Sequence, residues 1–219
     1  MSKVGIIGAS GYTGAELLRL CAAHPELSVE LATGDSQAGT AIAELYPSLA
    51  AAYGDLTFAP YEDGAADGLD LVFLGLPHGA SQAIVPDLLD RVPHVVDLAA
   101  DFRLKDPALY PEWYGEPHAA PELLGRFVYG LPEVYRDDLA GAAAVAVPGC
   151  YPTAANLALG PLVRSGLVEP TGIVVDAASG ETTAIINPAT GEEIGQAPAS
   201  TSADVDRAVT AARAAFDGG

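Results

Sequence analysis

Cysteine, basic residues and long apolar runs are all scarce in this chain of 219 residues. Its two cysteines, Cys21 and Cys150, are too few for a disulfide framework or a cysteine-ligated metal cluster. Ten basic side chains stand against 29 acidic ones, and the net charge of −19 argues against nucleic acid or an anionic membrane as partner. No apolar run reaches the roughly 18 residues of a transmembrane helix, and residues 1–4 lead into an apolar strand pattern without a signal-peptide layout. We therefore expect a cytoplasmic globular protein.

Hydrophobic residues are abundant, at 50% of the chain against 18% charged, which predicts a folded protein with a sizeable core. Apolar segments of strand length alternate with segments of helical periodicity. The expected strands are 3–7, 29–32, 69–74, 94–98 and 143–147, and the expected helices are 13–23, 81–89 and 153–165. Residues 101–135, rich in proline and tyrosine, are expected to be irregular. The alternation predicts an α/β fold with a mainly parallel sheet and right-handed crossovers.

The pattern changes after Gly180. Residues 185–195 predict two short strands around an Asn-Pro…Gly turn. Residues 201–216 predict an amphipathic helix that begins with a capping box formed by Thr201 and Asp204. The apolar stripe of that helix consists of Val205, Val209, Ala212 and Phe216.

Three glycines follow the first expected strand and open the first expected helix, with the spacing G-x-x-G-x-x-G. Glycines at such a turn let the main chain approach a pyrophosphate, and the helix N-terminus supplies free N–H groups and a positive dipole end. The loop therefore predicts a dinucleotide site. Its expected contacts are Gly8, Ser10, Gly11, Tyr12, Thr13 and Gly14. The alternative is a tight strand-to-helix turn that binds nothing.

The end of the second expected strand bears on the choice between NAD and NADP. An acidic residue there normally binds the ribose hydroxyls of NAD, whereas an arginine accommodates the 2′-phosphate of NADP. Residues 33–37 contain Asp35 but no arginine, and Ser36, Thr33 and backbone amides can still hold a phosphate. On these residues alone the choice stays open.

Cys150 lies where a buried strand is expected to turn into a helix. There the sulfur faces the positive end of the helix, which favours the thiolate, and neighbouring N–H groups can hold an oxyanion. Pro152 suits a first helical turn, where its missing N–H costs nothing. Cys150 is therefore a candidate nucleophile, and the alternative is a small apolar residue that caps a strand. Cys21, in the middle of a helix, is expected to pack in the core.

Two further positions are candidates for ligand contacts. Arg103 is one of few cations in an acidic chain, and its guanidinium suits an anionic substrate. The alternative for Arg103 is an ordinary ion pair with Asp101 or Asp106. Pro77 and His78 follow an expected strand at the edge where a parallel sheet binds its cofactor, so we expect cofactor-side or turn residues there.

Taken together, these motifs resemble those of the N-acetyl-gamma-glutamyl-phosphate reductases. The matching segments are 8–14, 74–79, 97–104, 129–133 and 148–153. The resemblance implies a Rossmann-like, doubly wound dinucleotide-binding domain over residues 1–149, NADP as cofactor and a homo-oligomer. It also implies Cys150 as nucleophile on an acyl phosphate in arginine biosynthesis, with hydride from NADPH reducing the resulting thioester to a semialdehyde.

The resemblance stops near Gly180. The family's catalytic histidine lies beyond this point, but the histidines of this chain all precede Cys150; they are His24, His78, His94 and His118. Residues 185–219 instead resemble the N-terminal segment of an aldehyde dehydrogenase. We therefore expect an incomplete catalytic α+β domain over 150–180, a strand–strand–helix tail over 181–219, and slow turnover by this chain alone. Two alternatives remain: an aspartate-semialdehyde dehydrogenase, or a dinucleotide-binding module without catalysis.

Overall fold

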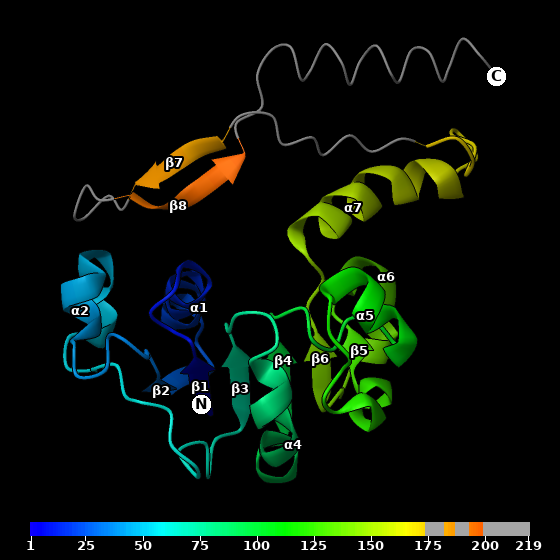
Figure 1. The fold of residues 1–219 in the computed structure, drawn as a ribbon. Coiled ribbons are helices and arrows are strands. Elements are labelled where there is room, and N and C mark those ends of the chain that lie inside the picture. Colours follow the sequence, from blue (N-terminus) through cyan, green and yellow to red (C-terminus); the bar gives the residue numbers. More distant parts are fainter. Residues whose placement is uncertain (174–181, 187–192, 199–219) are drawn as a thin grey trace. The chain divides into compact units, whose positions relative to one another are not determined.

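Six parallel strands form the main sheet of the computed structural model, which describes residues 1–173, 182–186 and 193–198. The strands are β1 (Ser2–Ile7), β2 (Leu27–Ala32), β3 (Leu71–Leu74), β4 (His94–Asp97), β5 (Val128–Tyr129) and β6 (Ala144–Ala146). Their order across the sheet is β2-β1-β3-β4-β6-β5 (Figure 1). This arrangement confirms the predicted α/β fold with a Rossmann-like parallel sheet.

Alternating side chains place the strands between two hydrophobic cores. In β1, Val4 and Ile6 belong to the core that α1 (Tyr12–Ala23) covers with Leu18, whereas Ile7 belongs to the opposite core. In β3, Val72 and Leu74 lie in that second core, which Val85 and Leu88 of α4 (Ser81–Arg91) help to fill. Because successive side chains of a strand point to opposite faces, a strand that is apolar at every position requires cover on both sides.

The remaining helices are short, apart from the last. They are α2 (Ile42–Leu45), η1 (Pro47–Leu49), α3 (Ala50–Tyr53), η2 (Pro107–Leu109), α5 (Tyr110–Tyr114), η3 (Pro121–Arg126), α6 (Pro132–Leu139) and α7 (Cys150–Arg164). The segment 101–135, expected to be irregular, thus contains the edge strand β5 and several helical turns. That expectation was wrong because elements of two to six residues carry too little periodicity to be recognised.

The chain divides after Gly149 into two compact units, Met1–Gly149 and Cys150–Gly219. In the second unit, α7 begins at Cys150, three residues earlier than expected. The expected strand pair is present as β7 (Thr182–Ile186) and β8 (Glu193–Pro198), which run antiparallel. The turn between them and the expected helix 201–216 lie outside the described residues. In the part of the chain that the structure describes, no helix has the length and apolar character to cross a membrane.

The sheet order places a topological switch point at β1. The chain moves from β1 to β2 on one side, and then to β3 on the other side of β1. Loops that follow neighbouring strands diverge at such a point and leave a crevice at the carboxyl edge of the sheet, where ligands bind in open α/β folds. The segment after β1 is the glycine loop, and the segment after β3 contains Pro77 and His78.

Candidate functional site

Gly8 follows β1 directly and has a conformation that suits glycine. Its φ of +83° lies in the left-handed region, and a Cβ atom there would lie 2.5 Å from the carbonyl oxygen of Gly75. The Gly8 N–H donates to Oγ1 of Thr33 at 3.1 Å, and the Ala9 N–H donates to the main-chain oxygen of Thr33 at 2.7 Å. The segments that follow β1, β2 and β3 therefore meet at this loop.

Gly14 and Gly11 have different surroundings. A Cβ atom on buried Gly14 would lie 2.4 Å from the Cα atom of Ala9, so glycine allows α1 to pack directly on the loop. Gly11 is exposed, and a Cβ atom there would meet only the Gly8 oxygen, at 3.7 Å. A turn without ligand explains Gly8 and Gly14 by close packing, whereas Gly11 is the N-cap of α1, a position that glycine favours, and has no such packing. The open main chain at Gly11, beside the free N–H groups of Tyr12 and Thr13 in the first turn of α1, fits an approaching pyrophosphate.

Tyr46, which follows α2, supports the glycine loop from a distant part of the sequence. Its hydroxyl donates to the main-chain oxygen of Ser10 at 2.6 Å and lies 3.4 Å from that of Gly11. Burial, and the nearby Tyr12, raise the pKa of Tyr46, so its hydroxyl keeps the proton that it donates. No sequence signal indicates this role, because 36 residues separate donor and acceptor.

Replacing Tyr46 with phenylalanine tests whether this hydrogen bond shapes the loop. We expect the free energy of unfolding to fall by about 1 kcal/mol and the affinity for dinucleotide to fall about fivefold, the contribution of one hydrogen bond. Urea denaturation and fluorescence titration measure the two effects. Tyr53→Phe is the matched control, because the Tyr53 hydroxyl donates to the Leu18 oxygen at 2.8 Å, away from the loop. Equal affinities in the two variants would contradict a role for Tyr46 in the loop.

The residues after β2 divide into buried and exposed groups. Thr33 is buried, and its Oγ1 accepts from Gly8, so it supports the loop rather than standing free for a phosphate. Gly34 is also buried, and a Cβ atom there would lie 2.9 Å from the side chain of Ser10. Asp35 and Ser36 are exposed. Both therefore remain candidates for contact with the adenosine ribose or its phosphate.

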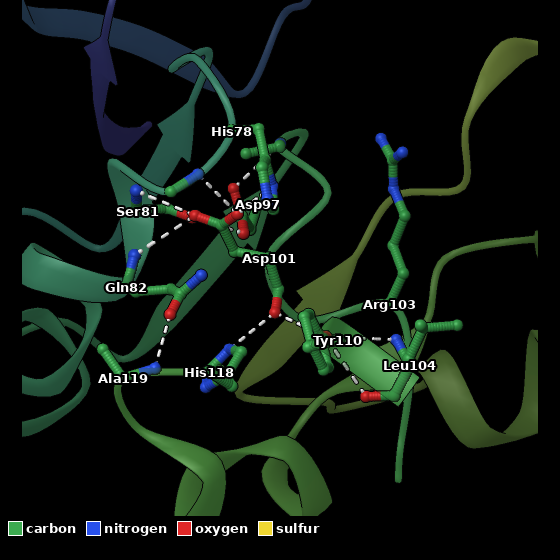
Figure 2. A network of polar contacts seen from close by, with 12 residues as sticks. His78, Ser81, Gln82, Asp97, Asp101, Arg103, Leu104, Tyr110, His118 and Ala119 are labelled. Atoms are coloured by element: carbon green, nitrogen blue, oxygen red, sulfur yellow. Dashed lines mark hydrogen bonds and ion pairs between the residues drawn. The ribbon is translucent and has the colours of Figure 1, made fainter. Parts of the chain in front are cut away.

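His78 lies in the loop after β3, beside the irregular segment that follows β4. Its Nδ1 atom lies 2.6 Å from Oδ1 of Asp101 (Figure 2). Its ring stacks on Tyr114 with centroids 4.5 Å apart. The side chain is 38% exposed, and Pro77 beside it is exposed as well. The hydrogen bonds of the described residues leave Nε2 of His78 without a partner. This loop also abuts Gly8 through Gly75, and the place of Pro77 and His78 at the cofactor site stays a prediction.

Asp101 connects the loops after β3 and β4. Its carboxylate accepts from the main-chain N–H groups of Gly79, Ser81 and Gln82 and from the Ser81 hydroxyl (Figure 2). Burial alone would raise the pKa of Asp101, but these hydrogen bonds and nearby His78 together hold it below its usual value. The Asp101 main-chain oxygen accepts from the Tyr110 hydroxyl at 2.6 Å and lies 2.7 Å from Nε2 of His118.

Arg103 forms neither of the ion pairs that the sequence offered. Its Nε donates to the Val147 oxygen at 2.7 Å and its Nη2 to the Leu98 oxygen at 2.9 Å, so it joins the ends of β6 and β4. Asp101 is held by the loop after β3 instead, and Asp106 accepts from the Ala108 N–H at the start of η2. In Figure 2 the Arg103 guanidinium lies away from the Asp101 carboxylate. Contact with a substrate remains a prediction for this residue.

The two cysteines differ sharply in environment. Cys150 is the first residue of the fifteen-residue helix α7 and is exposed. No acidic side chain occupies the first turn of α7, so the positive end of its dipole is not neutralised from within the helix. Cys21 is buried in the core beneath α1, and burial raises the pKa of its thiol. The expected core packing of Cys21 is confirmed, and the role of Cys150 as nucleophile stays a prediction.

Comparison with known families gives two matches along the chain. Residues 3–142 match the semialdehyde dehydrogenase NAD binding domain, and residues 150–203 match the semialdehyde dehydrogenase dimerisation domain. The second match extends past Gly180, so the expected junction there and the aldehyde dehydrogenase-like character of residues 185–219 stay predictions.

Curated relatives and solved structures agree with this family. The chain is 49% identical over 180 residues to proteins named N-acetyl-gamma-glutamyl-phosphate reductase from Pseudomonas putida (strain W619) and Pseudomonas entomophila (strain L48). Each match covers 82% of this chain but 52% of the relative, so the chain spans about half the length of these proteins. Aspartate semialdehyde dehydrogenase with NADP from Candida albicans has a similar fold, with a TM-score of 0.54 and 17% identity over 75% of this chain and 47% of that chain.

Proposed function

Because the chain belongs to the semialdehyde dehydrogenase family through its NAD binding domain, we propose that it serves the NADP-dependent reduction of N-acetyl-gamma-glutamyl phosphate to the semialdehyde. The observation that carries the proposal is that the chain has both an open glycine loop after β1 and an exposed cysteine as the first residue of α7. The names of the relatives at 49% identity support the substrate. The distant likeness to aspartate semialdehyde dehydrogenases, at 17% identity, supports the fold alone.

The N-terminal unit supplies the groups that would hold the cofactor. Gly11 leaves room for a pyrophosphate, and Tyr12 and Thr13 offer N–H groups at the positive end of α1. Ser36, exposed after β2, would contact the adenosine ribose or its phosphate, and Pro77 and His78, exposed after β3, would line the cofactor site on the β3 side. When bound, NADPH supplies the hydride for the reduction.

Cys150 would perform the covalent chemistry. Its thiolate attacks the acyl carbon, a carbon–sulfur bond forms, and the carbon–oxygen bond to phosphate breaks, which leaves a thioester and free phosphate. Reduction of the thioester then breaks the carbon–sulfur bond, returns the thiolate and yields the semialdehyde. Main-chain N–H groups at the start of α7 would stabilise the oxyanion that precedes each bond cleavage. Arg103 is the cation that we assign to the anionic substrate.

The match of residues 150–203 to a dimerisation domain supports a homo-oligomer. We place the contacts that join the copies in the second unit, which begins at Cys150. Cys150, the proposed nucleophile, would then be the first residue of the unit through which the copies associate.

Nucleotide titration tests the proposed function. We expect NADPH to bind the chain at least about tenfold more tightly than NADH, a preference of about 1.4 kcal/mol. Fluorescence of the reduced nicotinamide reports both equilibria, and Cys150→Ser should bind both nucleotides as the unaltered chain does. Equal or tighter binding of NADH would contradict the choice of NADP.

Turnover assays separate the proposed reaction from its two alternatives. Incubation with N-acetyl-gamma-glutamyl phosphate and NADPH should release phosphate and semialdehyde. We expect a slow rate, because no histidine follows Cys150 in these 219 residues. General acid–base catalysis accelerates such reactions by about 10²–10⁴-fold. Preferential turnover of aspartyl phosphate would favour an aspartate-semialdehyde dehydrogenase. Nucleotide binding without any product, even in single-turnover assays, would favour a non-catalytic binding module.

A further inference from the structure

One hydroxyl group lies between two buried carboxylates at the carboxyl edge of the sheet. Oγ of Ser81 lies 2.6 Å from Oδ2 of Asp101 and 3.0 Å from Oδ2 of Asp97. All three side chains are fully buried. A hydroxyl carries a single proton, so Ser81 can donate to only one of the two carboxylates. The other contact is a hydrogen bond only if that second carboxyl group carries a proton and donates it to Ser81.

The surroundings of the two acids decide which one holds the proton. Asp101 accepts three main-chain N–H donors and lies against His78, and these partners favour its charged form. Asp97 accepts one main-chain N–H, from Ala99 at 2.9 Å. Burial raises the pKa of Asp97 to about 6, and the charge of Asp101 adds to this effect. The chain of donors therefore runs from Asp97 through the Ser81 hydroxyl to Asp101.

The second carboxylate oxygen of Asp101 determines which ring nitrogen of His78 carries the proton. Oδ1 of Asp101 lies 2.6 Å from Nδ1 of His78, so Nδ1 carries a proton and donates it. In the neutral ring, Nε2 then holds a lone pair and is a hydrogen-bond acceptor. The stacking of the ring on Tyr114 restricts the remaining rotation. His78 thus presents an acceptor of fixed direction in the loop that follows β3, the loop whose Gly75 abuts Gly8.

We propose that Asp101 is a positioning residue that fixes Nε2 of His78 as the acceptor for a donor group of the bound dinucleotide, and that Asp97, in its acid form, completes the hydrogen-bond chain that holds Asp101. The donor is a ribose hydroxyl or the nicotinamide carboxamide, the two kinds of donor that the nicotinamide nucleoside of the dinucleotide offers. This inference rests on the proposed function, because it assigns a role in the same nucleotide site.

Titration of Asp97 should therefore alter nucleotide binding. The titratable and charged groups that act on Asp97 are Asp101, Arg103 and Tyr110, while His78 acts on Asp101 from the exposed side. Below about pH 6 Asp97 carries its proton and donates to Ser81. Above this pH the donor is lost and the Ser81 oxygen faces a second negative charge. The contribution of Asp97 to the affinity for dinucleotide is accordingly expected to fall as the pH rises through 6. It is measured as the difference between the unaltered chain and Asp97→Asn, because a protonated His78 ring lacks the Nε2 lone pair in both.

Imidazole ¹⁵N spectra of the chain without nucleotide test the state of His78 directly. We expect the tautomer protonated at Nδ1 for His78. His118 provides the internal reference, because its Nδ1 accepts from the Ala120 N–H at 3.0 Å and its ring must therefore carry the proton on Nε2. On addition of NADP⁺, the Nε2 resonance of His78 should shift while that of His118 stays in place. A His78 ring protonated at Nε2 alone would overturn the inference whether or not the chain binds nucleotide.

Carboxylate variants test the chain of donors through the affinity for NADP⁺ between pH 5 and pH 8. In Asp101→Asn, Nδ1 of His78 loses its carboxylate acceptor, so the tautomer of His78 is no longer fixed. The affinity for NADP⁺ should fall about fivefold at every pH, the effect of one hydrogen bond. Asp97→Asn places an amide donor permanently against Ser81 and keeps the acceptor for Ala99, so the loss of affinity that Asp97 causes above pH 6 should disappear. Asp106→Asn, a change of the same charge at the start of η2, is the matched control and should leave the pH profile unaltered.

The outcomes distinguish this inference from the proposed function. If Asp101→Asn fails to fold, Ser81→Ala decides the question, because it removes only the hydroxyl link and should also abolish the fall in affinity that Asp97 causes above pH 6. Binding by the unaltered chain that neither Asp101→Asn nor Asp97→Asn changes at any pH would overturn the inference and leave the proposed function intact. Failure of the unaltered chain to bind NADP⁺ at any pH would overturn the proposed function together with the role given to Nε2.

Discussion

Replacing Gly14 with alanine is expected to reduce the free energy of unfolding by about 2–3 kcal/mol. The added Cβ atom would lie 2.4 Å from Cα and 2.5 Å from both C and O of Ala9. These are main-chain atoms that cannot rotate away. We therefore expect the strain energy of the added Cβ atom to lie at the upper end of the ~1–3 kcal/mol typical of overpacking. Alanine also gains about 1 kcal/mol of helix propensity over glycine inside α1. The clash exceeds this gain, and urea denaturation followed by circular dichroism measures the difference.

Gly11→Ala is the matched control for this substitution. The Gly11 backbone, with φ of −86° and ψ of 171°, accepts any residue, and its added Cβ atom would meet only the Gly8 oxygen at 3.7 Å. We expect a loss of stability of about 0.5–1 kcal/mol, smaller than that of Gly14→Ala, because alanine is a poorer N-cap than glycine. The affinity for NADPH should nevertheless fall roughly tenfold, because the methyl group stands where the pyrophosphate approaches. Unchanged affinity in Gly11→Ala would favour the ligand-free turn.

Iodoacetamide is expected to alkylate Cys150 about a hundredfold faster than Cys21 in the folded chain. Only the thiolate reacts, and burial both raises the pKa of the Cys21 thiol and shields it, whereas Cys150 is exposed at the start of α7. A local opening that costs about 3 kcal/mol slows reaction at a buried site by roughly this factor. Peptide mapping by mass spectrometry after timed quenching gives both rates.

Labelling in urea provides the control for the two cysteines. The difference between them should shrink to less than about tenfold once the chain unfolds, because only the folded structure separates their environments. Nucleotide binding should survive the alkylation of Cys150, because the glycine loop belongs to the other unit. Similar rates for Cys21 and Cys150 in the folded chain would show that Cys150 is an ordinary thiol.

The sequence predicted those features that depend on neighbours along the chain. The expected strand 3–7 is β1, the expected helix 13–23 is α1 within one residue, and the parallel sheet follows from their alternation. The position of Cys150 between a buried strand and a helix was equally accessible, because a short apolar run followed by a proline near a helix start is a local signal. By contrast, the two-residue strand β5 was missed, since it pairs with β6 and has no pattern of its own.

The partners of the polar side chains were not accessible from the sequence. The alternative of an ion pair between Arg103 and a nearby acid was wrong, because its guanidinium binds the carbonyl oxygens of Leu98 and Val147, and its contact with a substrate stays a prediction. Asp101 lies close to Arg103 in sequence, but its carboxylate is bound by residues about twenty positions earlier. Parallel strands bring together chain segments that lie far apart in sequence, so the groups gathered at their carboxyl ends cannot be read from spacing.

The sequence by itself determined that this chain forms a parallel α/β sheet with a glycine loop after its first strand and a cysteine at the start of a later helix. Hydrophobic periodicity and turn residues act over a few neighbouring positions, which is why these features could be predicted. Only the tertiary structure decided that Gly8 must be glycine because Gly75 approaches it, that Tyr46 supports the loop, and that Ser81 lies between two carboxylates. Each of these contacts joins loops from different strands, and their meeting depends on strand order and register, which no local pattern specifies.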